Sequence, residues 1–226
     1  MTLRGALAGR RLVRHTRTDV VIGLGGYVSV PAVVGGRLAG RPVLLFEPNA
    51  AAGTANRWLS RLADEAAAAY ESTTSAFHCR STVTGTPVRP EFFAQPREPR
   101  RPPLVLVLGG SQGARQLNEV VPAALGRMAD PGEAPRVLHQ CGEANVEATR
   151  RAYEAAAPRL ASLEVAPFLD DVASALGRAS LVISRAGAVT LAEICAVGRA
   201  AVLVPLSIAA AAEAVRSLIR TNGDLR

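Results

Sequence analysis

One short pattern constrains the fold of this chain more than any other: an apolar run passes directly into a glycine turn and then into a helical pattern. Leu104–Leu108 is apolar throughout and predicts a buried strand. Gly109, Gly110 and Gly113 predict a tight turn, and a helical pattern begins at Ala114. Such a corner points a helix N-terminus and free backbone N–H groups at one place, which favours binding of an anion, above all phosphate.

The same order of elements recurs along the chain. A first block predicts a helix within residues 2–17, strands at 20–24, 43–46, 66–70 and 81–84, and helices at 28–38 and 56–62. A second block adds strands at 137–140, 163–166, 181–184 and 201–205 and helices at 115–127, 145–156, 172–177, 191–197 and 209–219. Repeated βα alternation predicts parallel sheets covered by helices on both faces. Because residues 95–103 are rich in proline and charge, we expect two Rossmann-like α/β domains, residues 1–96 and 97–226.

Composition narrows the class of function. The net charge is +7 and all 26 basic residues are Arg, which favours phosphates or an anionic membrane surface as partners. Nucleic acid is not expected, because aromatic residues make up only 4% of the chain and interleave no basic patch. The three Cys and three His are scattered, so no metal and no cofactor are expected. The Arg-rich residues 4–17 fit either a helix on a membrane surface or a helix packed on a sheet.

A second corner follows the strand predicted at 181–184. Gly187 forms the turn, and the spacing of Thr190 and Glu193 is that of a capping box, which would make their role purely structural. The alternative is that free N–H groups hold a phosphate while Glu193 accepts hydrogen bonds from ribose hydroxyls. Two helix N-termini at one sheet edge could clamp a diphosphate. Neither corner has the Gly-Lys-Ser/Thr ending of a P-loop.

Five segments resemble motifs of the MurG family, the bacterial UDP-N-acetylglucosamine:N-acetylmuramyl-(pentapeptide) pyrophosphoryl-undecaprenol N-acetylglucosaminyltransferases of peptidoglycan synthesis. The segments are residues 19–29 (DVVIGLGGYVS), 46–49 (FEPN), 85–89 (GTPVR), 108–115 (LGGSQGAR) and 184–193 (SRAGAVTLAE). They appear in the family's order, and the resemblance runs from about Arg17 to Leu206.

The resemblance implies a GT-B glycosyltransferase that transfers N-acetylglucosamine from UDP-N-acetylglucosamine to undecaprenyl-linked lipid I, forming lipid II. It implies a UDP-sugar site on the C-terminal domain and an acceptor- and membrane-side N-terminal domain. The protein would be cytoplasmic and peripheral on the inner face of the cell membrane, and would serve cell shape and cell division. The transfer itself would need no metal, because helix dipoles and an Arg stabilise the leaving diphosphate.

The resemblance also implies roles for single residues. Ser111 would contact the diphosphate or its ribose, Arg89 would neutralise phosphate charge, and Glu193 would bind the ribose. Asn49 would contact the sugar, and Leu169 would offer backbone groups to uracil. The other residues expected around the nucleotide are Ala188, Val189, Thr190, Leu191 and Ala192, and the phosphate-loop glycines are Gly25, Gly26, Gly109, Gly110, Gly113 and Gly187.

The chain departs from the family pattern at both ends. The family's first glycine loop, Gly-Gly-Thr-Gly-Gly-His, carries a candidate catalytic His, and its place would lie before Met1. The family's polar run after Leu206 is replaced by the alanine-rich residues 207–214. We therefore expect both domains to be incomplete, and the catalytic residue stays unknown. Two interpretations remain: an active transferase, or a catalytically impaired or inactive nucleotide-sugar-binding fragment of that family.

Overall fold

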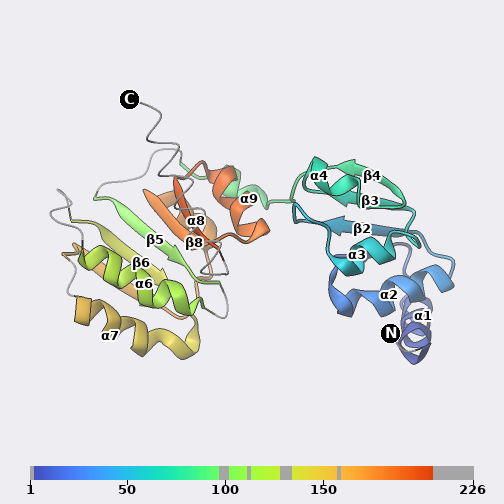
Figure 1. Ribbon diagram of the computed structural model, residues 1–226, viewed down its shortest axis with the longest axis horizontal. Helices are drawn as coiled ribbons and strands as arrows, with labels where there is room; N and C mark the ends of the chain where they lie inside the picture. The colour runs from blue at the N-terminus through green and yellow to red at the C-terminus, as the bar shows by residue number, and fades with distance from the viewer. Residues whose placement is uncertain (1–2, 97–101, 111–112, 128–133, 157–158, 206–226) are drawn as a thin grey trace. The chain divides into compact units, whose positions relative to one another are not determined.

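The computed structural model describes residues 3–96, 102–110, 113–127, 134–156 and 159–205. It divides into two compact units, Met1–Pro87 and Val88–Arg226, each built on one parallel sheet (Figure 1). None of the helices in these ranges is long and apolar enough to cross a membrane. The two parallel sheets confirm the α/β class and the two Rossmann-like units that the alternation predicts.

The first unit contains a four-stranded sheet in the order β1-β2-β3-β4. Its elements are α1 (Leu3–His15), β1 (Val21–Gly23), α2 (Gly26–Leu38), β2 (Val43–Glu47), α3 (Thr54–Leu59), β3 (Glu65–Ala68), α4 (Glu71–Thr74) and β4 (Arg80–Val83). Alternate residues of the strands, among them Val21, Val43 and Leu45, are buried under α1, α2 and α3. This period of two is what one helix-covered sheet face requires. Two bounds differ from the prediction. The third strand, β3, covers residues 65–68 and is shorter than the predicted 66–70, and α3 begins two residues earlier than predicted.

The Arg-rich segment is a helix packed on the first unit. Ala6 and Val13 of α1 are buried in its core, which supports the packed-helix interpretation. The two helices α1 and α2 meet through glycines: a Cβ on Gly9 or on Gly35 would collide with the backbone of the facing helix. Only glycine permits this separation, so the sequence of α1 fixes how closely it lies on α2.

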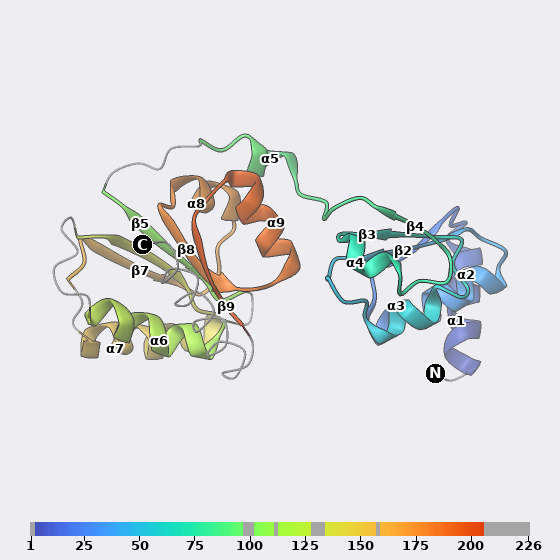
Figure 2. The ribbon, with the colours of Figure 1, turned by 45° about the horizontal axis from the view of Figure 1, so that its top comes forward.

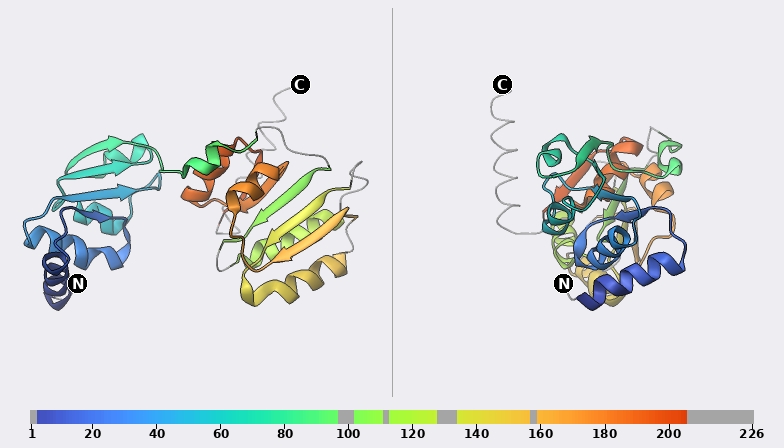
Figure 3. Two further views of the ribbon diagram at one scale, coloured as in Figure 1. Left: turned by 180° about the vertical axis from the view of Figure 1, so that it is seen from behind. Right: turned by 90° about the vertical axis from the view of Figure 1, so that its right-hand side faces the viewer.

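The second unit contains a five-stranded sheet in the order β7-β6-β5-β8-β9. Its elements are α5 (Pro90–Phe93), β5 (Leu104–Leu108), α6 (Arg115–Gly126), β6 (Arg136–Gln140), the 3₁₀ helix η1 (Glu143–Asn145), α7 (Val146–Ala156), β7 (Ser162–Ala166), α8 (Val172–Arg178), β8 (Leu181–Arg185), α9 (Ala188–Val197) and β9 (Ala201–Val204). The helices α6 and α7 cover one face of this sheet, and α8 and α9 cover the other (Figures 2 and 3).

The central strand β5 is buried on both faces. Leu104, Leu106 and Leu108 face α8 and α9, whereas Val105 and Val107 face α6 and α7. From β5 the chain builds outward through β6 and β7, then returns to the other side of β5 with β8 and β9. The strand order thus reverses beside β5, and ligands of such sheets bind at the carboxyl ends of the strands at this switch point.

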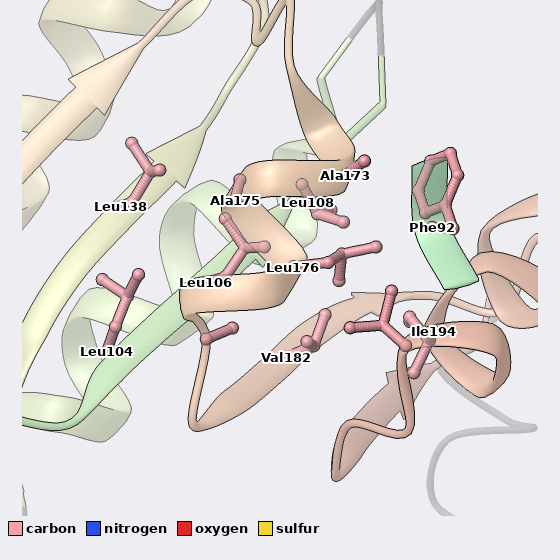
Figure 4. Close-up of a cluster of buried hydrophobic side chains, with 12 residues drawn as sticks. Phe92, Leu104, Leu106, Leu108, Leu138, Ala173, Ala175, Leu176, Val182 and Ile194 are labelled. Atoms are coloured by element: carbon pink, nitrogen blue, oxygen red, sulfur yellow. The ribbon is translucent and has the colours of Figure 1, made fainter. Parts of the chain in front are cut away.

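The boundary between the units falls between Pro87 and Val88, ahead of the predicted boundary after residue 96. The reason is α5, whose Phe92 is completely buried in the second core, beside Leu176 and Ile194 (Figure 4). A proline-rich composition does not reveal that one aromatic side chain ties the preceding segment to the next unit. The predicted helix 209–219 and part of the predicted linker lie outside the described residues.

Candidate functional site

A pocket of about 520 Å³ lies at the carboxyl ends of β5 and β8 in the second unit. It is lined by both predicted glycine corners, together with residues of β6 and α8: Leu108, Gly109, Gly110, Gly113, Gln140, Val172, Arg185, Ala186, Gly187, Thr190 and Glu193. The two corners therefore open on one place, as the sequence predicts. A pocket of this volume at the switch point is of the size that small-molecule ligands occupy.

The first corner is held by close backbone contacts. The N–H of Gly109 donates to the carbonyl oxygen of Gln140 at 3.0 Å, and the N–H of Gly113 donates to that of Gly110 at 2.9 Å. Gly110 and Gly113 have φ of 80° and 72°, and a Cβ on Gly113 would collide with the backbone carbonyl of Cys141. Glycine is required there both by conformation and by space. No side chain of the described residues caps the start of α6.

The second corner leads into α9. The residue that precedes this helix is Gly187, and no side chain among the described residues caps it. Thr190 lies inside the helix, so the capping box that its spacing with Glu193 predicts is wrong. The first N–H groups of α9 remain available at the pocket, which Thr190 and Glu193 both line.

Glu193 is an electrostatically perturbed carboxylate in this pocket. Burial raises its pKa, the nearby Arg89 lowers it, and Glu91 raises it again. The guanidinium of Arg89 forms an ion pair with Glu91 at 3.0 Å and lies over the ring of Phe92, 5.2 Å from its centre. Arg89 therefore belongs to the second unit, where α5 holds it near the carboxylate that the sequence assigns to the ribose.

The other predicted residues are distributed between the two units. Ala188, Val189, Leu191 and Ala192 belong to α9, and Leu169 packs against the core of the same unit. Asn49 follows β2 in the first unit, and Gly25 and Gly26 form the β1–α2 corner there, with φ of 84° and 72°. Ser111 lies outside the described residues.

Two polar pocket residues were not assigned from the sequence. Arg185 is the last residue of β8, and Gln140 is the last residue of β6. Arg185 lines the pocket, and no ion pair of the described residues includes its guanidinium. The sequence did contain a signal for Arg185, which stands directly before a glycine corner. An arginine at that position adds positive charge where two helix N-termini already favour binding of an anion.

A buried polar network supports the segment after β6. His139 is fully buried, with Nδ1 3.0 Å from the Tyr153 hydroxyl and Nε2 3.1 Å from Oδ1 of Asn118. Nδ2 of Asn118 donates to the Cys141 carbonyl, against which Gly113 also packs. This fixes Oδ1 toward His139, so Nε2 carries the proton and the Tyr153 hydroxyl donates to Nδ1. Burial lowers the pKa of His139 to about 4 and raises that of Tyr153.

No cluster that could hold a metal occurs among the described residues.

Comparison with known proteins supports the motif resemblance. Residues 2–68 match the glycosyltransferase family 28 N-terminal domain, and residues 104–215 match the glycosyltransferase family 28 C-terminal domain. A UDP-N-acetylglucosamine--N-acetylmuramyl-(pentapeptide) pyrophosphoryl-undecaprenol N-acetylglucosamine transferase from Ectopseudomonas mendocina is 49% identical over 208 residues, which are 90% of this chain and 57% of that protein. The transferase of the same name from Halorhodospira halophila is 46% identical over 207 residues, 89% of this chain and 56% of that protein.

A crystal structure of Acinetobacter baumannii MurG has the same fold, with a TM-score of 0.72 and 37% identity. The match covers 91% of this chain and 58% of the crystallised chain. This chain thus spans a little more than half the length of the relatives it matches. The predicted resemblance to MurG and the predicted GT-B class are confirmed: the chain belongs to glycosyltransferase family 28 and has the fold of its MurG members.

Proposed function

We propose that this chain binds UDP-N-acetylglucosamine and transfers its sugar to undecaprenyl-linked lipid I, forming lipid II. One observation carries the proposal: two uncapped helix N-termini, a cation and a half-buried carboxylate surround a single pocket. This combination suits a nucleoside diphosphate, whose phosphates need donors and positive charge and whose ribose needs acceptors.

The pocket offers a physical route to leaving-group stabilisation. Transfer of the sugar leaves negative charge on the UDP diphosphate. The N–H groups at the starts of α6 and α9 and the guanidinium of Arg185 supply fixed positive potential beside it. Glu193 accepts hydrogen bonds from the ribose hydroxyls, and the nearby Arg89 partly offsets the rise in the pKa of Glu193 that burial causes.

The remaining assignments follow the family motifs. We propose that Ser111 contacts the diphosphate or its ribose and that Leu169 offers backbone groups to uracil. Residues 188–192 border the nucleotide, and Asn49 contacts the sugar.

We also propose that the first unit meets the cytoplasmic face of the membrane through the exposed side of α1. This side combines positive charge with exposed leucines: Arg4, Leu7, Arg11, Leu12, Arg14 and His15. Such a surface binds anionic lipid through both charge and apolar contact. Sedimentation with anionic vesicles tests it: Arg11→Gln/Arg14→Gln should weaken binding, whereas Arg150→Gln/Arg151→Gln, on exposed residues of α7, should not.

A transfer assay tests the main proposal. The chain is incubated with radiolabelled UDP-N-acetylglucosamine and a lipid I analogue, and UDP affinity is measured in parallel by calorimetry. Glu193→Ala and Arg185→Ala should each reduce UDP affinity and product, whereas Glu164→Ala, an exposed carboxylate on β7, should change neither. Binding of UDP without product would support the non-catalytic nucleotide-sugar-binding alternative. Absence of UDP binding would refute both.

A further inference from the structure

One polar residue of the pocket, Gln140 at the end of β6, has no role in the proposed chemistry. Its backbone carbonyl accepts from the N–H of Gly109, but its side-chain amide has no hydrogen-bond partner among the described residues. The residue is 4% exposed, and neither amide atom is sealed from solvent. Gln140 thus lines the pocket with an amide whose donor hydrogens and acceptor oxygen are available to a ligand.

The alternation of β6 gives the direction of the Gln140 side chain. Val137 belongs to the hydrophobic cluster under α6 and α7, and the ring of His139 bonds to side chains of the same two helices. Leu138 belongs to the cluster under α8 and α9 (Figure 4). Because successive side chains of a strand point to opposite faces, Gln140 faces the same way as Leu138, toward α8 and α9.

The surroundings of Gln140 on that face are aliphatic. In the register of the sheet it stands between Leu108 of β5 and Ala166 of β7, and Val172, the first residue of α8, lines the same pocket. A buried amide that makes no hydrogen bond is destabilising, and an aliphatic side chain of the same length would pack there without that loss. A hydrogen-bonding ligand offsets the loss, so the amide indicates direct contact with the molecule that occupies the pocket.

The pocket has two sides of different charge. Arg185 lines both this pocket and a smaller cavity against the first turn of α6, so its guanidinium marks the α6 side as the place for phosphates. On the α8 and α9 side, Gln140 and Val172 are neutral, and the carboxyl group of Glu193 does not attract phosphate. A nucleoside suits this second side, because its base and ribose are uncharged and carry both hydrogen-bond donors and acceptors.

We infer that Gln140 is a ligand-binding residue for the nucleoside half of the nucleotide, which it contacts through its side-chain amide. This inference rests on the proposed function, in which the pocket holds UDP. The alternative is that Gln140 only closes the wall of the pocket. The two roles can be separated, because loss of a wall residue lowers stability, whereas loss of a ligand contact lowers affinity alone.

Gln140→Met is the test variant. Met has a similar length and no branch, but it has no amide donor or acceptor. We expect the affinities for UDP and for uridine, measured by calorimetry on the full chain, to fall by the same factor of about five to ten, the size of one lost hydrogen bond. The urea midpoint of the second unit, measured by hydrogen exchange on the β5 and β6 peptides, should not fall, because no hydrogen bond within the protein is lost.

Two comparison variants locate the effect. Gln95→Met is the matched control, because the Gln95 amide donates to the Glu91 carbonyl at 3.1 Å and does not line the pocket. It should lower the urea midpoint and leave both affinities unchanged. Arg185→Ala removes the cation of the phosphate side, so it should lower the affinity for UDP but not that for uridine.

Three results would overturn the inference while the native chain binds UDP. Unchanged UDP affinity in Gln140→Met would show that the amide makes no contact. A loss of UDP affinity with unchanged uridine affinity would place the amide on the phosphates. A loss of both affinities together with a lower midpoint would show that Gln140 acts by holding the wall. Absence of UDP binding by the native chain is a different result, because it refutes the proposed function itself.

Discussion

The buried His139 makes the stability of the second unit depend on pH in a direction that can be calculated. Burial lowers its folded pKa from 6.5 to about 4, so the folded state favours the neutral ring. In the unfolded chain the ring binds a proton near its ordinary pKa. A depressed folded pKa means that the stabilisation is fully present above pH 6.5 and is lost as the pH falls toward 4. The second unit should therefore weaken in mild acid.

The magnitude follows from the two pKa values. Relative to pH 7.5, proton uptake by the unfolded chain alone removes about 2 kcal/mol of unfolding free energy at pH 5 and about 3 kcal/mol at pH 4. This is a large part of the 5–15 kcal/mol that is typical of a domain. The hydrogen bond that Nδ1 accepts from the Tyr153 hydroxyl requires the neutral ring, whereas Nε2–H donates to Asn118 in either protonation state. Protonation therefore removes the acceptor that the Tyr153 hydroxyl uses.

Urea titrations at pH 7.5 and pH 5, read by pulsed hydrogen exchange on the β6 peptide, measure this loss for the second unit. The comparison variant is His139→Gln, whose amide can accept from Tyr153 and donate to Asn118 without titrating. The native chain should lose about 2 kcal/mol more than the variant between the two pH values. Equal losses in the two proteins would refute the reasoning, whatever the absolute stability of the variant.

Three further predictions concern backbone space and one arginine. Gly113→Ala should lower the unfolding free energy of the second unit by about 2–3 kcal/mol and weaken UDP binding, because the new Cβ would collide with the Cys141 carbonyl. Gly110→Ala should lower it by only about 1 kcal/mol, because no atom lies near that Cβ. Gly35→Ala should lower the first unit's stability by about 1–3 kcal/mol, seen in Trp58 emission, by forcing α2 away from Gly9. Arg199→Lys should cost about 1–3 kcal/mol in urea unfolding, because one ammonium cannot reach the three carbonyls that the guanidinium binds near the end of α8. Unchanged midpoints in these variants would contradict these close contacts.

Much of the fold could be predicted because its signals are local. The all-apolar β5 predicts a strand buried on both faces, and the structure buries all five of its residues. The glycines at both corners predict strand-to-helix turns, and parallel topology then brings the corners to one edge. Periodicity thus determines which elements exist, and alternation determines which end of the sheet carries the pocket.

The errors have two causes, a helix start placed from spacing alone and a contact between residues far apart in sequence. Thr190 and Glu193 have the spacing of a capping box, but the helix begins at Ala188, so spacing alone misassigned the first turn. Phe92 sits beside a proline-rich stretch that predicted a linker, yet its ring is buried between α8 and α9. Burial of one side chain outweighs a local tendency to break structure, and no short window of sequence contains the partner that buries it.

The same reasoning explains why the glycine corner depends on residues outside the recognised motifs. Positions 109 and 113 require glycine because the Gln140 carbonyl at the end of β6 and the Cys141 carbonyl lie directly against them. That carbonyl is held by amide groups of Asn118 and Asn145, and Asn118 is oriented in turn by the buried His139. A corner motif therefore specifies the backbone geometry of this pocket only when its buried supports are intact. A related chain that keeps the glycines but loses this network should retain the motif without its anion affinity.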